Sequence, residues 1–231
     1  MTGLRAPNRG TADERAGGTG AEVKLCGMMS GRDVAAAQVA GCDHVGFVIS
    51  RSRRQVSPSD VRQWLKSHVH PHPVLVGAGL SQAQWLDACE VAGVSAVQVC
   101  GDASPQLCAD LRGRGLQVWR AISATDDLNA DSVREYDGAV DVLLIDTHDP
   151  HLAGGTGRAF AWDLLARVRK VLRVPLFVAG GLDPSSVTHL LAGYAPDGVD
   201  VSSGIETDGQ KDPEKMIQFV RQVRGECHGA G

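Results

Sequence analysis

The sequence predicts a single α/β domain, a (β/α)8 TIM barrel with parallel strands, and two observations support this. From residue 23 onward, short runs rich in valine and leucine alternate with helix-length amphipathic segments. The runs are nearly continuous in apolar character, as expected of strands buried on both faces. Eight such pairs in roughly 205 residues suit a compact barrel. A doubly wound open sheet uses the same units, but eight strands would be many for it, and no GxGxxG follows the first run.

The predicted strands share a short length and an aliphatic character. They are Val23–Leu25, His44–Ile49, Val74–Val76, Ala96–Val99, Gln117–Ile122, Val140–Ile145, Leu176–Ala179 and Gly198–Val201. The predicted helices are marked by capping residues or proline at the start and often by glycine at the end. They are Gly31–Ala40, a segment from Ser57-Pro58, Ser81–Ala92, a segment from Ser104-Pro105 to about Gly113, Asp131–Tyr136, Trp162–Val171, Pro184–Leu191 and Pro213–Arg224.

Composition limits the domain organisation and the partners. Residues 1–22 are rich in Gly, Thr, Ala and Arg without apolar periodicity, so we expect a disordered N-terminal tail followed by a barrel domain over residues 23–231. No apolar run is long enough to span a membrane. The net charge of -4 gives no electrostatic reason to expect nucleic acid. The six cysteines include no CxxC pair and no metal spacing, which favours a reduced, cytoplasmic chain.

Two side chains at predicted strand ends are candidates for acid–base chemistry, because the carboxyl ends of barrel strands share one mouth. Cys26 follows the first strand, and its thiolate could act as a base or nucleophile if neighbours lower its pKa. The alternative is a buried structural cysteine. Asp146 ends a strongly apolar strand, where a carboxyl group can serve as a general acid. The alternative is an aspartate that caps the next loop.

Two small-residue loops follow the last two predicted strands. One contains Gly180 and Gly181, and the other contains Ser202, Ser203 and Gly204. Barrels frequently bind phosphate between the loops after strands 7 and 8, where backbone N–H groups can approach an anion. Together the loops favour a phosphate site, although either alone would also suit a plain βα loop. A third glycine-rich loop, residues 148–158, is long enough to be functional.

Several motifs, taken in chain order, resemble phosphoribosylanthranilate isomerase of the tryptophan pathway, from about Val23 to Arg224. They are Val-Lys-Leu-Cys-Gly (23–27), Val-Gly-Phe-Val (45–48) with Arg54-Gln-Val-Ser-Pro58, Ile-Asp-Thr (145–147) with Gly-Gly-Thr-Gly (154–157), Ala-Gly-Gly-Leu-Asp-Pro (179–184), and Val-Asp-Val-Ser-Ser-Gly-Ile-Glu (199–206) with Lys211-Asp-Pro-Glu-Lys215. The resemblance implies a cofactor-free Amadori rearrangement of N-(5-phosphoribosyl)anthranilate, with no metal ion and a small phosphoribosyl substrate. We expect a monomer or a homodimer.

The resemblance implies a role for each matching position. Asp146 matches the general acid that opens the furanose ring, and Cys26 matches the base that removes the C2 proton. Arg54 matches a residue that faces the anthranilate carboxylate, although a solvated basic loop is the plain alternative. Asp200 matches a polar position near the ribose. The positions that match or flank the phosphate cradle are Gly180, Gly181, Ser202, Ser203 and Gly204.

Three positions depart from the family pattern on the aromatic side of the expected pocket. Gly79 replaces an aromatic residue, Cys100 replaces a histidine, and Ala161 replaces an aspartate. These departures motivate a second hypothesis, a paralogue that performs the same rearrangement on a substituted anthranilate or a related phosphoribosylamine. A third hypothesis is a phosphosugar-binding protein without catalytic activity, since a fold does not determine a function.

Overall fold

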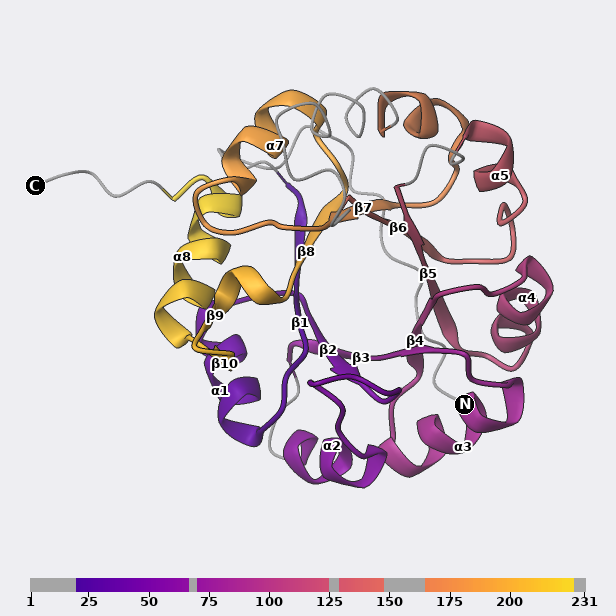
Figure 1. Cartoon of the computed structure of the whole chain (residues 1–231), viewed down its shortest axis with the longest axis horizontal. Coiled ribbons are helices and arrows are strands. Elements are labelled where there is room, and N and C mark those ends of the chain that lie inside the picture. The colour runs from indigo at the N-terminus through magenta and orange to yellow at the C-terminus, as the bar shows by residue number, and fades with distance from the viewer. Residues whose placement is uncertain (1–19, 67–69, 125–128, 148–164, 227–231) are drawn as a thin grey trace, which may run out of the picture.

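The computed structural model describes residues 20–66, 70–124, 129–147 and 165–226. Eight parallel strands close into a barrel in chain order, and helices surround it (Figure 1). This confirms the predicted fold class. The strands are β1 Glu22–Cys26, β2 His44–Val48, β3 His72–Ala78, β4 Ala96–Cys100, β5 Gln117–Ser123, β6 Val142–Asp146, β7 Leu176–Ala179 and β8 Gly198–Val201.

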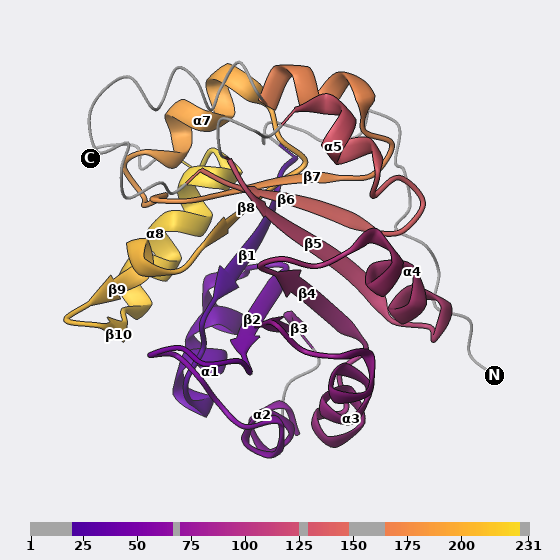
Figure 2. The same cartoon turned by 45° about the vertical axis from the view of Figure 1, so that its right-hand side comes forward.

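The helices lie on the outside of the barrel, where they cover the sheet in chain order (Figures 1 and 2). The named ones are α1 Gly31–Ala40, α2 Pro58–Leu65, α3 Gln82–Ala92, α4 Pro105–Gly113, α5 Ala130–Arg134, α7 Val187–Tyr194 and α8 Pro213–Arg224. Residues 165–171 are also helical. None of the helices in the described ranges has the length and hydropathy that a membrane span requires.

The barrel closes at a seam between the first and last strands. In β1, Leu25 pairs with Val45 of β2 on one side, and Val23 pairs with Val199 of β8 on the other. Helix α8 lies beside α1 and completes the outer ring (Figure 1). The seam therefore brings the two ends of the described chain together.

Capping signals placed most helix starts correctly. The hydroxyl of Ser57 accepts a hydrogen bond from the Asp60 N–H, and the carboxylate of Asp212 accepts from the N–H groups of Glu214 and Lys215. The helix predicted from Pro184 begins instead at Val187. The reason is that the Asp183 carboxylate accepts from the N–H groups of Ser185 and Ser186, which holds residues 184–186 in a turn.

The segment between β8 and α8, for which the sequence analysis predicts no helix or strand, contains three short elements. A short 3-10 helix over Ser203–Ile205 is followed by two small antiparallel strands, β9 Glu206–Thr207 and β10 Gln210–Lys211. In Figure 2 this hairpin projects beside α8. It carries two charged side chains that matter at the site.

The last residues of the predicted tail, 1–22, are ordered in the structure. Residues 1–19 lie outside the described residues. Ala21 is buried, and Glu22 begins β1, with its N–H donating to the Asp197 carbonyl. Residues 21 and 22 therefore belong to the barrel, because β1 needs them to pair with the start of β8.

The floor of the barrel is filled by aromatic side chains. The rings of Trp119 and Phe177 lie 4.6 Å apart between centroids, and His44 meets Trp119 edge-on at 4.9 Å. Trp119 and Phe177 belong to an interior cluster that includes Val142 and Leu144. A larger apolar cluster lies between the sheet and the helices. Because the floor is filled, polar chemistry is confined to the carboxyl ends of the strands.

Candidate active site

The end of β1 places two polar side chains inside the barrel. Lys24 and Cys26 alternate with the outward-facing residues of β1, and both lie against Gly46 of β2. A Cβ atom at position 46 would stand 2.7 Å from Cys26 Sγ and 3.1 Å from Lys24 Nζ. Glycine at this position therefore leaves the space that the thiol and the ammonium group occupy.

Lys24 forms a buried ion pair with Asp200 of β8. The Lys24 side chain is fully buried, and its Nζ lies 2.9 Å from Asp200 Oδ1. Burial acts to lower the pKa of Lys24, but the carboxylate of Asp200 and the neighbouring Cys26 more than offset this and raise it. A charged ammonium group is therefore fixed beneath Cys26, and Asp200, predicted to lie near the ribose, is its counter-ion.

Cys26 is buried, and two opposing effects act on its pKa. Burial raises the pKa of the thiol, while the positive charges of Lys24 and Lys211 act against that rise. Burial wins, so the pKa lies above its ordinary value. The sequence argument required neighbours that lower it, and the structure shows that such neighbours exist but are outweighed. A thiolate formed here is a strong base beside a cation.

This balance predicts slow alkylation of Cys26 at neutral pH. Because the thiolate is the nucleophile, its reaction with iodoacetamide should rise about tenfold per pH unit and continue to rise past the ordinary thiol range. Peptide-resolved mass spectrometry across a pH series measures this rate. Cys100, whose pKa is raised to about 11 by burial, gives an internal comparison in the same sample. A Cys26 rate that levels off below pH 8 would contradict the assignment.

Asp146 ends β6 on the inward face, because Val142 and Leu144 of the same strand line the barrel interior. Its backbone is fixed on both sides. The Ala124 N–H donates to the Asp146 carbonyl at 2.8 Å, and the next residue, Thr147, donates from N–H and hydroxyl to the Ala179 carbonyl. Asp146 is half-buried, at the carboxyl end of the strand.

The loops after β7 and β8 touch, as a shared anion site requires. A Cβ atom at Gly204 would overlap the backbone carbonyl of Leu182 and stand 2.9 Å from the Asp183 Cα. Gly180 and Gly181 have φ angles of 100° and 63°, which glycine adopts without strain. The Ser202 hydroxyl donates to the Cys26 carbonyl at 3.1 Å. These contacts place the predicted phosphate loops beside the candidate base.

Gly204→Ala should separate the two loops. Because the added methyl group meets backbone rather than a movable side chain, we expect KM for the substrate to rise at least about tenfold, with a smaller change in kcat. Steady-state kinetics and competitive inhibition by inorganic phosphate measure the effect. Gly113→Ala in α4, where a Cβ meets no other atom within 4 Å, is the matched control. Unchanged phosphate inhibition in the Gly204 variant would show that this loop does not bind phosphate.

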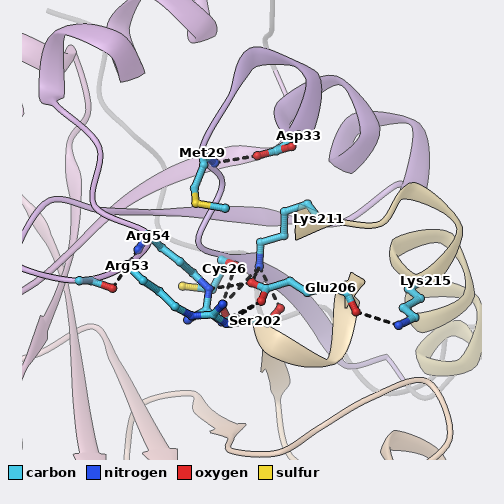
Figure 3. Close-up of polar contacts among 10 residues, drawn as sticks. Cys26, Met29, Asp33, Arg53, Arg54, Ser202, Glu206, Lys211 and Lys215 are labelled. Carbon is cyan, nitrogen blue, oxygen red and sulfur yellow. Dashed lines mark hydrogen bonds and ion pairs between the residues drawn. The ribbon is translucent and has the colours of Figure 1, made fainter. Parts of the chain in front are cut away.

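Arg54 follows β2, and its guanidinium is paired with Glu206, a partner that the sequence analysis did not include. Its Nε lies 2.6 Å and its Nη2 3.0 Å from the two carboxylate oxygens of Glu206 (Figure 3). The Arg54 stem lies across Gly27, because a Cβ there would stand 2.6 Å from Arg54 Cδ. Arg54 therefore lies next to the end of β1 and close to Cys26, but already carries a counter-ion.

The aromatic side of the predicted pocket is described only in part. The glycine-rich loop and Ala161 lie outside the described residues. Gly79 has a φ of 71°, and a Cβ there would meet no atom within 4 Å. Cys100 is half-buried, and the amide of Gln98 donates to its sulfur at 3.5 Å. The described residues hold no group of three or more His, Cys, Asp and Glu side chains placed to bind a metal ion.

The family model described as "N-(5'phosphoribosyl)anthranilate (PRA) isomerase" matches residues 23–222. The chain belongs to this family. A curated N-(5'-phosphoribosyl)anthranilate isomerase from Geobacillus thermodenitrificans is 37% identical over 208 residues, covering 87% of this chain and 93% of the relative.

Solved structures of the isomerase family agree with this membership. One is a phosphoribosyl anthranilate isomerase in complex with reduced 1-(o-carboxyphenylamino)-1-deoxyribulose 5-phosphate, with a TM-score of 0.76 and 28% identity over 89% of this chain and 99% of that chain. Another is a monomeric form of the dimeric Thermotoga maritima enzyme, with a TM-score of 0.75 and 27% identity over 88% of this chain and 98% of that chain. The relatives therefore match the barrel over nearly its whole length.

Sequence analysis assigned no role to three side chains at the mouth of the barrel of this isomerase-family chain. They are Lys24, Glu206 and Lys211. Lys24 carried a signal, because a lysine two residues before Cys26 in a strand must share its inward face. Glu206 and Lys211 belong to a stretch whose composition indicates only a polar turn. Their role becomes visible once β9 and β10 bring them against Arg54.

Proposed function

We propose that this chain isomerises N-(5'-phosphoribosyl)anthranilate to 1-(o-carboxyphenylamino)-1-deoxyribulose 5-phosphate, an aldose–ketose rearrangement in tryptophan biosynthesis. One observation carries the proposal: Cys26 and Asp146 end two strands at a single barrel mouth, beside two touching small-residue loops. Family membership supplies the reaction class. The relative solved with a reduced form of the product supports the same choice of substrate.

The residues at the mouth divide the reaction between them. The loops that contain Gly180, Gly181, Ser202, Ser203 and Gly204 hold the substrate phosphate through backbone N–H groups. Asp146 gives a proton to the furanose ring oxygen as the C1–O bond breaks, which leaves a protonated imine at C1. The Cys26 thiolate then removes the C2 proton to give an enolamine. The Cys26 thiol then returns its proton to C1 while the C2 hydroxyl loses its proton, which restores Asp146 and makes C2 the ketone carbonyl.

Lys24 supports the second step without contacting the reacting atoms. Its charge lies beside the Cys26 sulfur and favours the thiolate over the thiol. Asp200 keeps this lysine charged and fixed. The atoms balance within the substrate and these two proton-transfer groups, so the rearrangement needs no oxidant or reductant.

A fluorescence assay on the purified protein tests the proposal, because the anthranilate group reports the change as the ring opens and rearranges. Complementation of a tryptophan auxotroph that lacks the isomerase tests the same activity in a cell. Turnover in the assay would eliminate the non-catalytic phosphosugar-binding alternative. Absence of turnover together with absence of complementation would overturn the proposed function.

The open space at Gly79 favours a second candidate, a paralogue that takes a substituted anthranilate. This glycine and the half-buried Cys100 stand at the ends of neighbouring strands, β3 and β4. A substituent on the aromatic ring would find room there. Comparing kcat/KM for the unsubstituted and ring-substituted substrates decides between the two: a higher value for a substituted substrate, with poor complementation, would favour the paralogue.

We propose a cytoplasmic monomer or homodimer. The described cysteines are free thiols, as expected in a reducing compartment. The Thermotoga maritima relative is described as dimeric, with monomers obtained from it. Light scattering on the purified chain measures which state it adopts.

A further inference from the structure

Glu206 lies at the centre of a cationic cluster next to the candidate base. Its carboxylate accepts from Arg53 Nη2 at 2.7 Å, Arg54 Nε at 2.6 Å, Arg54 Nη2 at 3.0 Å and Lys211 Nζ at 2.8 Å (Figure 3). The Glu206 side chain is 5% exposed. Burial acts to raise the pKa of Glu206, but hydrogen bonds from Arg54 and Lys211 outweigh it and bring the pKa to about 2. The group is a carboxylate at any physiological pH.

The geometry of the Arg54–Glu206 pair leaves one edge of the guanidinium available. Glu206 takes the edge formed by Nε and Nη2, which uses two of the five N–H donors. Nη1 donates to no described residue. The remaining fork, formed by Nη1 and the second N–H of Nη2, suits another carboxylate in a bidentate arrangement. A counter-ion on one edge thus orients the guanidinium without occupying its other edge.

Lys211 extends the network from Glu206 to the phosphate loop. Its side chain is fully buried, and besides Glu206 it donates to the Ser202 carbonyl at 2.9 Å. The Ser202 hydroxyl in turn donates to the Cys26 carbonyl. Ser202 precedes Ser203 and Gly204, whose backbone forms the proposed cradle. Figure 3 shows Lys211 and the arginines reaching Glu206 from different sides, with Ser202 and Cys26 close by.

We propose that Glu206 is a positioning residue for both ends of the substrate. Through Arg54 it aims a guanidinium fork at the carboxylate on the aromatic ring, and through Lys211 it fixes the loop that holds the phosphate. Glu206 contacts neither group itself. This inference rests on the proposed function and names residues that serve it.

The Glu206→Gln variant tests the effect of Glu206 that acts through Arg54. The neutral amide offers the arginine one acceptor oxygen instead of two, so we expect KM to rise about tenfold while kcat changes less than about threefold. In a double-mutant cycle with Arg54→Ala, the Glu206 effect on KM should fall to the part that acts through Lys211 once the arginine is removed. Additive effects would overturn the proposal. Arg134→Ala is the control, because this side chain is 60% exposed and pairs with Asp131 in α5 instead of Glu206, and its KM should stay within about twofold.

The Lys211→Met variant tests the effect that acts through Lys211 on the phosphate loop. Without the ammonium group, the Ser202 carbonyl loses its donor, so the inhibition constant of inorganic phosphate should rise at least about fivefold. An unchanged inhibition constant would show that Lys211 does not fix the phosphate loop. If Glu206→Gln does not fold, as judged by circular dichroism, Glu206→Asp replaces it, since the shorter side chain retains the charge but cannot reach all three partners.

A binding measurement separates failure of this inference from failure of the proposed function. Anthranilate titrated into the wild type and Glu206→Gln reports the carboxylate site by fluorescence without any turnover. We expect weaker binding in the variant. If the wild type does not isomerise the substrate, the proposed function fails, while equal anthranilate binding by both proteins overturns the positioning role alone.

Discussion

The Asp146→Asn protein is expected to lose at least about 10²-fold in kcat, with KM little changed, because an amide cannot supply the proton that opens the ring. The substituted side chain keeps its size, and the backbone of β6 stays fixed by Ala124 and Ala179. Steady-state fluorescence kinetics measure the loss. Asp131→Asn, at a position whose side chain is 88% exposed in α5, is the control and should retain wild-type kcat.

Cys26→Ala should show a loss of the same order, because the enolamine step then has no base at C2. Cys89→Ala in α3, far along the chain and on the outer layer, controls for the removal of a buried thiol. Wild-type-like turnover in either the Asp146 or the Cys26 variant would defeat the assignment of acid and base. Full phosphate inhibition in both variants would show that the cradle survives.

Lys24→Met is expected to destabilise the fold by about 3–5 kcal/mol, because it leaves the Asp200 carboxylate buried and unpaired. The two groups lie inside the barrel, so water cannot take the place of the lost ammonium group. Urea denaturation monitored by circular dichroism measures the free energy of unfolding. The variant should also alkylate Cys26 more slowly at each pH, since the thiolate loses its cation.

The double variant Lys24→Met/Asp200→Leu distinguishes an unpaired charge from a packing defect. Replacing both partners by apolar side chains removes the buried charge, so most of the lost stability should return while the activity stays low. A double variant that is as unstable as Lys24→Met alone would show that the lysine acts through packing. A single variant as stable as the wild type would show that water reaches Asp200.

Elements whose ends are marked by capping residues, proline or glycine were predictable from the sequence. The boundaries of β7, β8, α1 and α8 agree with the prediction, because caps, prolines and glycines mark them. The start of α7 was not predictable by the same rule. Asp183-Pro184 has the pattern of a helix start, but the Asp183 carboxylate stabilises a turn before the helix begins. A capping signal alone cannot distinguish these two outcomes.

Some residues of the candidate site were likewise predictable from the sequence, and others were not. Cys26 and Asp146 could be found because strand ends in a barrel converge, whatever their separation in sequence. The Arg54–Glu206 pair could not, because 152 residues separate its partners and no periodicity connects them. Only closure of the barrel brings the loop after β2 against the hairpin after β8. The pKa of Cys26 was also beyond the sequence, because it depends on how burial compares with the charges of two lysines.

The seam between β1 and β8 has a consequence for the order in which the protein acquires activity during synthesis. Cys26 leaves the ribosome among the first residues of the barrel, whereas Ser202, which donates to its carbonyl, follows 176 residues later. Lys211 and its bond to Ser202 come later still. A nascent chain that contains Cys26 and Asp146 but ends before β8 therefore lacks the residues that support the proposed base and the proposed phosphate loop. The reaction becomes possible only after β8 and the hairpin that follows it have been made and β8 has paired with β1.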